Sequence, residues 1–168
     1  RGSDEGIRKV LDRLTEQGIV SADRSSRYAL YRLNRDHLAA RYIIALAVLR
    51  MEVIEAIKAD QAAWTIPPLH SSLFGSYARG TADMRSDIDV LVVRPEGLGP
   101  EDATWLDQVG LLQDHIQAWT GNPAQIIDIA PETLGRMARE ADPLVQSWRS
   151  DHVPLAGEPL FELLRRVR

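Results

Sequence analysis

The stretch FGSYARG (residues 74–80), followed by SDIDVLVV (residues 86–93), decides how this sequence is interpreted. The second segment has the apolar run of a strand, in which residues i and i+2 project from the same face, so Asp87 and Asp89 are expected to point together. Two adjacent carboxylates repel each other unless a cation lies between them. Oxygen ligands of this kind suit Mg²⁺ or Mn²⁺, and Mg²⁺ usually also keeps substrate phosphates as ligands. The pair therefore predicts a divalent metal and a phosphate-bearing substrate.

The first segment predicts a phosphate-binding turn. Gly75 and Ser76 follow an expected strand and open an expected short helix. A glycine lets the backbone approach a ligand closely, and N–H groups at a helix start attract anions. Ser76 adds a hydroxyl donor. The role of Arg79 stays open between a phosphate contact and a brace for the turn. Together the two segments resemble a cradle for a nucleoside triphosphate facing a pair of metal ions.

Asp128 is a third candidate carboxylate. It lies in Ile126-Ile127-Asp128-Ile129, an expected strand that is otherwise apolar. A lone charge there is costly unless it is paired or binds metal. If this strand lies beside that of Asp87 and Asp89, three carboxylates converge and could serve two metal ions. The alternative is a structural ion pair with Arg79 or Arg136.

Outward from these segments, the sequence predicts an α+β fold in which a small mixed β-sheet is flanked by helices. Strands are expected at residues 69–74, 87–93 and 124–129, each bounded by Gly or Pro. Helices are expected at residues 101–120, from Pro131, from Asp142-Pro143, and over residues 159–167. The four tryptophans fall at helical positions, where core packing is the simpler role, and the four histidines show no metal-ligand spacing.

The N-terminal part differs in charge from the rest of the chain. Residues 1–41 hold nine Arg or Lys and six Asp or Glu, whereas the whole chain has a net charge of −4. A helix over residues 5–17, an extended pair at 19–20, a turn at 23–26 and a strand at 27–33 are expected here. A helix over residues 37–64 follows, with a first half so apolar that burial on all sides is expected. Three domains are predicted: residues 1–36, the connecting helix 37–64, and residues 65–168.

Composition narrows the functional classes. The chain has 168 residues, 45% of them hydrophobic, and no cysteine. These values favour a folded protein and exclude disulfides and thiolate chemistry. No apolar run reaches the roughly 18 residues of a membrane span, so a cytoplasmic protein without membrane contact is expected. The chain begins at Arg1, and we expect further residues upstream.

The combination of Gly75-Ser76, Gly80 and Asp87-x-Asp89 resembles the signature of the DNA polymerase β-like nucleotidyltransferase superfamily, most of all its minimal branch. The resemblance covers roughly residues 50–150. It implies metal-dependent transfer of a nucleoside monophosphate from a nucleoside triphosphate, with ATP the expected donor and a hydroxyl group as acceptor. It assigns catalytic metal ligation to Asp87, Asp89 and Asp128, and phosphate contact to Gly75 and Ser76. Arg79 is a further candidate for nucleotide binding. It also suggests a toxin–antitoxin role, in which a tyrosine of a partner toxin is the acceptor.

Residues 3–33 resemble the second half of a winged helix-turn-helix, with a recognition helix and a wing. This resemblance implies DNA contacts by Arg8, Lys9, Arg13, Arg24 and Arg27, made by a longer chain that includes the missing upstream helices. A DNA-binding transcription regulator, whose nucleotidyltransferase-like domain binds nucleotide or partners without turnover, is therefore the alternative function. An antibiotic-modifying nucleotidyltransferase is a third reading. Dimerisation through the apolar helix is a further expectation.

Overall fold

The computed structural model describes residues 3–24, 28–83 and 85–167. The chain forms two compact units, residues 1–50 and 51–168. The division falls inside one helix, α2 (Ala40–Ala62). No helix in the described part of the chain is both long and apolar enough to cross a bilayer.

The first unit contains helix α1 (Asp4–Glu16), a pair of strands and the first half of α2. Helix α1 begins after Ser3, whose hydroxyl accepts a hydrogen bond from the Gly6 N–H. Strands β1 (Val20–Asp23) and β2 (Leu30–Leu33) pair antiparallel, with Val20 opposite Leu33. The order helix, strand, strand is the one the sequence predicts, and residues 25–26 of the expected turn lie outside the described residues. No described residue of α1 is buried, and Ile7 and Val10 are more than half exposed.

The second unit contains a four-stranded mixed sheet in the order β5-β4-β3-β6. Its strands are β3 (His70–Phe74), β4 (Ile88–Val93), β5 (Ala124–Ile129) and β6 (Val153–Gly157). Strand β3 pairs antiparallel with β4 and β6, whereas β4 and β5 run parallel. The α+β fold with a small mixed sheet and flanking helices is therefore confirmed. Strand β6 is not among the expected strands.

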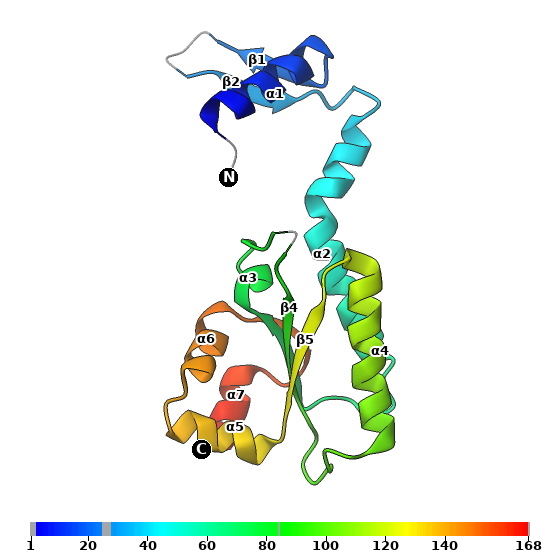
Figure 1. The fold of residues 1–168 in the computed structure, drawn as a ribbon, viewed down its shortest axis with the longest axis vertical. Coiled ribbons are helices and arrows are strands. Elements are labelled where there is room, and N and C mark those ends of the chain that lie inside the picture. Colours follow the sequence, from blue (N-terminus) through cyan, green and yellow to red (C-terminus); the bar gives the residue numbers. More distant parts are fainter. Residues whose placement is uncertain (1–2, 25–27, 84, 168) are drawn as a thin grey trace. The chain divides into compact units, whose positions relative to one another are not determined.

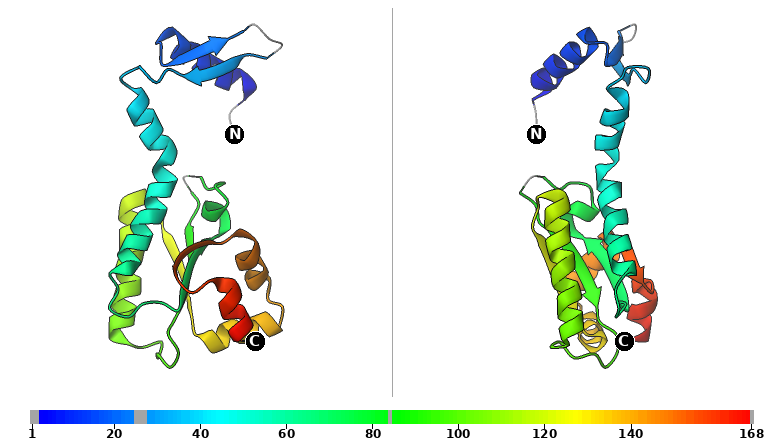
Figure 2. Two further views of the ribbon diagram at one scale, coloured as in Figure 1. Left: turned by 180° about the vertical axis from the view of Figure 1, so that it is seen from behind. Right: turned by 90° about the vertical axis from the view of Figure 1, so that its right-hand side faces the viewer.

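Helices cover both faces of this sheet (Figures 1 and 2). One face packs against the second half of α2 and against α4 (Ala103–Thr120), with Ile57, Trp105 and Leu112 in the core. The other face packs against α5 (Pro131–Arg139), α6 (Pro143–Asp151) and α7 (Leu160–Arg166), around Leu91 and Trp148. A strand buried on both faces should be apolar throughout, which explains the Ile-Asp-Val-Leu-Val-Val sequence of the central strand β4.

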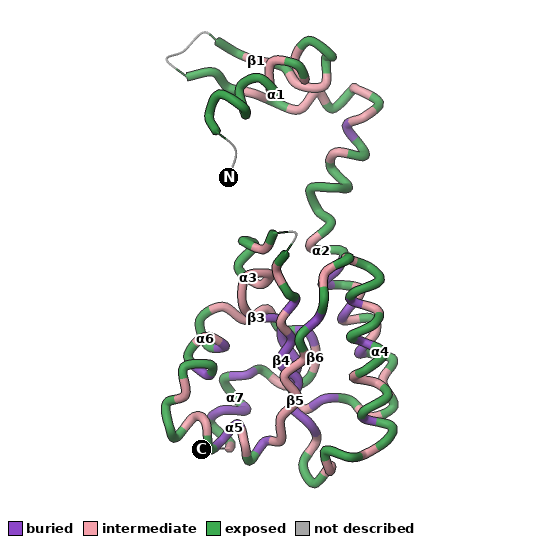
Figure 3. Tube along the Cα trace, viewed as in Figure 1, coloured by how far each residue is buried: buried purple, intermediate pink, exposed green. Residues whose placement is uncertain are grey.

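The first half of α2 differs from its expectation. Residues 41–49 were expected to be buried on all sides, yet most of them are exposed, and Leu46 is 72% exposed. Figure 3 shows the change from exposed to buried residues along this helix. Apart from Ala40 at its start, the buried residues of α2 begin at Val53, where the helix joins the core of the second unit. The sequence pattern identified an apolar helix correctly but not what covers it.

Candidate functional site

The two acidic residues of the motif lie together at the start of the central strand. Asp89 is the second residue of β4 and is half-buried, while Asp87 precedes the strand and is exposed. Burial raises the pKa of the Asp89 carboxyl, and the nearby charge of Asp87 raises it further, while Arg79 acts in the opposite direction. The Asp87 and Asp89 carboxylates are thus close enough to repel each other. This mutual repulsion is what a bound cation would relieve.

The glycine of the turn lies directly against Asp89. Phe74, at the end of β3, is the register partner of Asp89, and Gly75 follows it with a φ of +69°. A Cβ atom placed on Gly75 would lie 2.3 Å from Asp89 Oδ2. Both the backbone conformation and the contact require glycine at this position. The backbone of the turn therefore lies directly against the Asp89 carboxylate.

Beyond Gly75 the chain makes a single helical turn, α3 (Gly75–Ala78), with Ser76 half-buried within it. Such a short element contributes local N–H groups and a hydroxyl but not the dipole of a long helix. Thr81 closes the turn by donating its N–H to the Ser76 carbonyl at 2.9 Å.

Arg79 follows α3, and its guanidinium donates to Asp151 Oδ2 of α6 at 2.8 Å. This hydrogen bond lowers the pKa of the Asp151 carboxyl. Of the two roles considered for Arg79, bracing is thus seen directly, as a link between the turn and α6. The electrostatic effect of Arg79 on Asp89 also places its charge near the acidic pair.

Asn122 is a supporting residue that sequence reasoning missed. Its side-chain amide donates to the Ser86 carbonyl at 2.9 Å, and Ile88 donates its N–H to the Pro123 carbonyl at 2.9 Å. The turn before β5 therefore holds the backbone on both sides of Asp87. An Asn-Pro turn next to an expected strand was visible in the sequence, but nothing in it indicated this contact.

The expected convergence of three carboxylates is wrong. In the parallel register Asp128 is opposite Val92, which is three residues beyond Asp89, or about 10 Å along the strand. Because successive side chains alternate between faces, Asp128 also lies on the opposite face of the sheet from Asp89. Its Oδ2 accepts a hydrogen bond from Trp105 Nε1 at 3.0 Å, and its Oδ1 lies 3.4 Å from Arg94 Nε.

Asp128 therefore lies in a structural ion pair, which is the alternative that the sequence left open. Its partner is Arg94 rather than Arg79 or Arg136. The residue of β5 that does lie opposite Asp89 is Gln125, which is exposed. A neutral amide thus occupies the position from which a third carboxylate could reach Asp87 and Asp89.

The remaining donor set still fits a magnesium or manganese ion. Among the described residues no group of three or more His, Cys, Asp or Glu side chains could hold a metal. Two carboxylates that repel each other, beside an open turn, match the way Mg²⁺ is usually held, by one or two carboxylates and substrate phosphates. Asp87 and Asp89 are the residues that would hold the ion.

The basic residues expected to contact DNA lie on the first unit. Arg8, Lys9 and Arg13 are exposed on α1, and Arg24 is exposed after β1. Lys9 pairs with Glu5 at 2.7 Å, and Arg24 pairs with Asp12 at 2.7 Å. Arg27 lies outside the described residues. Part of this charge is therefore balanced within the unit.

A mixed sheet whose central strand starts with paired aspartates, held against a Gly-Ser turn, is consistent with the nucleotidyltransferase fold. Comparison with known families agrees: residues 51–130 match the family model described as a nucleotidyltransferase domain. The match covers β3, β4, α4 and β5 and includes Asp87 and Asp89. No curated protein matches the chain in sequence.

Several solved structures are similar to the chain. A toxin–antitoxin crystal structure with AMP-PNP is 21% identical, over 69% of this chain and 82% of that one, with a TM-score of 0.44. A mutant of the toxin–antitoxin MntA-HpeT is 17% identical, over 70% and 82% of the two chains, with a TM-score of 0.43. A protein provisionally described as a minimal nucleotidyltransferase is 24% identical, over 67% and 95%, with a TM-score of 0.38.

Proposed function

We propose that the second unit transfers a nucleoside monophosphate from a nucleoside triphosphate, with ATP as donor, to a hydroxyl group of another molecule. The observation that carries this proposal is the contact of Gly75 with the Asp89 carboxylate, beside Asp87 and within the electrostatic reach of Arg79. The match of residues 51–130 to the nucleotidyltransferase domain model supports the same chemistry.

In the proposed reaction the acceptor oxygen bonds to the α-phosphorus, and the bond from that phosphorus to the bridging oxygen breaks. Pyrophosphate leaves, and the hydroxyl proton passes to water. A divalent cation held by Asp87 and Asp89 would neutralise phosphate charge and favour the ionised acceptor. Gly75 and Ser76 bind the triphosphate, because the Gly75 position has no side chain in the way and Ser76 supplies a hydroxyl donor. Arg79 adds a positive charge whose orientation is set by Asp151.

The proposal defines the acceptor only by its hydroxyl group. A partner protein is one candidate, as suggested by the resemblance to the minimal branch, and a tyrosine hydroxyl of a toxin is the specific form of that proposal. The experiment must therefore detect transfer to any kind of acceptor molecule.

The experiment incubates the full chain with Mg²⁺, cell lysate and each of the four nucleoside triphosphates, labelled at the α-phosphate. We expect a labelled product from ATP, and no label from ATP labelled at the γ-phosphate, because pyrophosphate is the leaving group. Asp87→Asn and Asp89→Asn should each reduce labelling at least 100-fold, since each removes a proposed metal ligand. Asp107→Asn, an exposed acid of α4, is the matched control and should retain labelling.

Two results would contradict the proposal: absence of label with all four nucleotides, or label that persists in both the Asp87→Asn and Asp89→Asn variants. Sequence-specific DNA binding that is unchanged in those variants, together with absent labelling, would favour the alternative of a regulator that does not turn nucleotide over.

A further inference from the structure

A pocket lies on the α6 and α7 side of the sheet. It has a volume of about 330 Å³ and is lined by Arg149, His152, Leu160, Phe161, Leu164 and Arg165. This volume is at the lower end of the range for small-molecule sites. All six residues follow residue 130, so the pocket lies outside the segment that matches the nucleotidyltransferase domain model.

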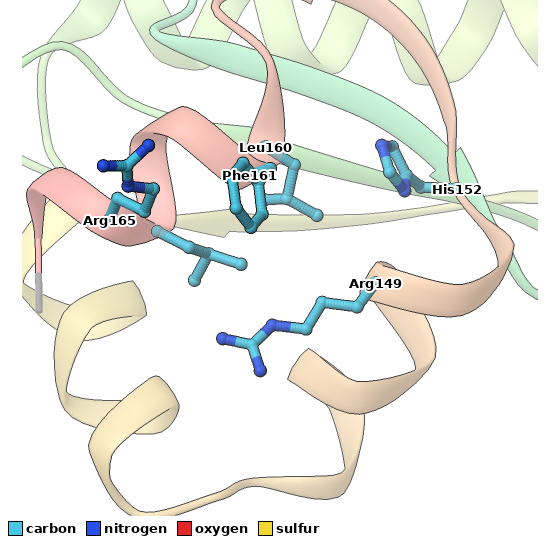
Figure 4. A pocket seen from close by; sticks show the side chains of 6 residues that line it. Arg149, His152, Leu160, Phe161 and Arg165 are labelled. Carbon is cyan, nitrogen blue, oxygen red and sulfur yellow. The ribbon is translucent and has the colours of Figure 1, made fainter.

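The pocket combines an apolar floor with unbalanced positive charge. Leu160 and Leu164 are buried and form the floor, while the Phe161 ring is 69% exposed above it. Arg149 of α6, Arg165 of α7 and His152 lie at different sides of the pocket, and the side chain of Arg149 extends toward its centre (Figure 4). The Arg165 guanidinium also lies 5.8 Å from the centre of the Phe161 ring.

Neither arginine has a carboxylate partner among the described residues. Of the nearby acids, Asp151 is bonded to Arg79, and Glu158 is bonded to Arg166. Glu162 of α7 does not line the pocket. Arginine side chains bind anions such as phosphate well, and Arg149 and Arg165 both line this pocket, although Arg165 also lines a neighbouring hollow with Glu162 and Arg166.

We propose that this pocket binds a small organic phosphate with an aromatic or apolar body. A phosphate monoester carries roughly −1.5 to −2 charge at neutral pH, which balances two arginines better than a carboxylate does. The planar guanidinium groups of Arg149 and Arg165 match phosphate oxygens in pairs. The ring of Phe161 and the two leucines contact the apolar body of the ligand, which inorganic phosphate lacks.

The pocket and the candidate metal site are separate but adjacent. Val153 of β6 pairs with Leu73, so His152 lies beside Phe74, and Phe74 in turn pairs with Asp89. Two strand spacings of about 4.8 Å separate the backbone at His152 from that at Asp89. His152 directly follows α6, the other five residues that line the pocket lie on α6 and α7, and the Gly75-Ser76 turn does not line it.

The test uses phenyl phosphate as the probe, with benzoate and inorganic phosphate for comparison, on the full chain. Isothermal titration gives the affinities, and ¹H–¹⁵N spectra locate the site. We expect phenyl phosphate to bind at least tenfold more tightly than either comparison compound and to shift the amide signals of residues 149, 152, 161 and 165. Arg149→Gln and Arg165→Gln should each weaken binding roughly tenfold or more, because each removes charge-assisted hydrogen bonds.

Phe161→Ala tests the apolar contact. It should weaken the binding of phenyl phosphate and leave the affinity for inorganic phosphate unchanged. Arg136→Gln, an exposed arginine of α5, is the matched control and should leave binding unchanged. The proposal is overturned if phenyl phosphate binds no better than inorganic phosphate, or if binding survives the loss of both pocket arginines. It is also overturned if binding is lost in Arg79→Gln but kept in Arg149→Gln, since the probe would then occupy the candidate nucleotide site.

Discussion

At the scale of single residues, Gly75 and Asp89 form one structural unit. Gly75 has a positive φ, and its missing side chain makes room for the Asp89 carboxylate. Burial and the charge of Asp87 both raise the pKa of Asp89, so the ionised form of this residue costs stability in the folded chain. Groups held at such a cost are typical of functional sites rather than of structural ones.

Gly75→Ala separates the two reasons for glycine. The left-handed backbone alone should cost about 1–2 kcal/mol, and the clash with Asp89 Oδ2 should add to it. In the double variant Gly75→Ala/Asp89→Ala the clash is absent, so only the backbone cost should remain. Urea unfolding of the single and double variants gives the free energies for a double-mutant cycle.

Gly80→Ala is the control, because Gly80 also has a positive φ but nothing lies within 4 Å of an added Cβ. The loss of unfolding free energy caused by Gly80→Ala should be similar in the unaltered chain and in the Asp89→Ala variant. Equal costs for Gly75→Ala in both backgrounds would mean that Asp89 does not need the space that glycine leaves.

At the scale of elements, the register between β4 and β5 decides which residues can meet. The alternation of apolar residues predicts that Asp87 and Asp89 share a face, since that property belongs to one strand. It does not predict which residue of β5 lies opposite Asp89, because register depends on the turn at residues 121–123 and on its bonds to Ser86 and Ile88. Asp128 was assigned to the acidic site for this reason, although Gln125 lies opposite Asp89.

Gln125→Glu should therefore supply the third carboxylate that Asp128 does not. Without metal the new charge should lower the melting temperature, because it adds repulsion next to Asp89. With Mn²⁺ the variant should bind the ion roughly tenfold more tightly than the unaltered chain, measured by electron paramagnetic resonance of free Mn²⁺. Gln146→Glu, at an exposed position of α6, is the matched control and should change neither quantity. Unchanged Mn²⁺ affinity in Gln125→Glu would show that Asp87 and Asp89 do not form a metal site beside residue 125.

Strand β6 shows a second limit of sequence patterns. Its sequence is Val153-Pro154-Leu155-Ala156-Gly157, and a proline normally argues against a strand. Proline is tolerated at an edge, where one side of the strand makes no ladder hydrogen bonds, and β6 is an edge strand. The central strands and most helices were predictable because their apolar patterns are long and their caps are explicit, as with Asp102 before α4 and Pro131 at the start of α5.

At the scale of the whole molecule, the core lies almost entirely in the second unit. Both hydrophobic clusters are built from residues 53–164, whereas Ala40 is the only hydrophobic residue buried among the described part of residues 1–50. Stability should follow buried apolar area, so the two units should differ sharply in what they contribute.

A fragment of residues 51–168 should keep the cooperative thermal unfolding of the full chain, with a melting temperature within a few degrees, and should keep the proposed nucleotidyl transfer. DNA binding by the full chain, if it occurs, should be absent from this fragment, because the basic helix α1 is removed. Calorimetry checks the unfolding, the labelling assay checks the nucleotidyl transfer, and a gel mobility assay checks the DNA binding. Loss of cooperative unfolding in the fragment would mean that residues 1–50 are needed for the fold of the rest.

The position of β6 in the sheet also bears on how the protein is made. Strand β3 is complete at residue 74, but the neighbour that covers one of its edges arrives only at residues 153–157. While the ribosome is still adding the intervening residues, that edge offers unpaired backbone groups to any other nascent strand. Synthesis of this chain therefore includes an interval of exposure to misassembly, which chaperone capture would be expected to shorten.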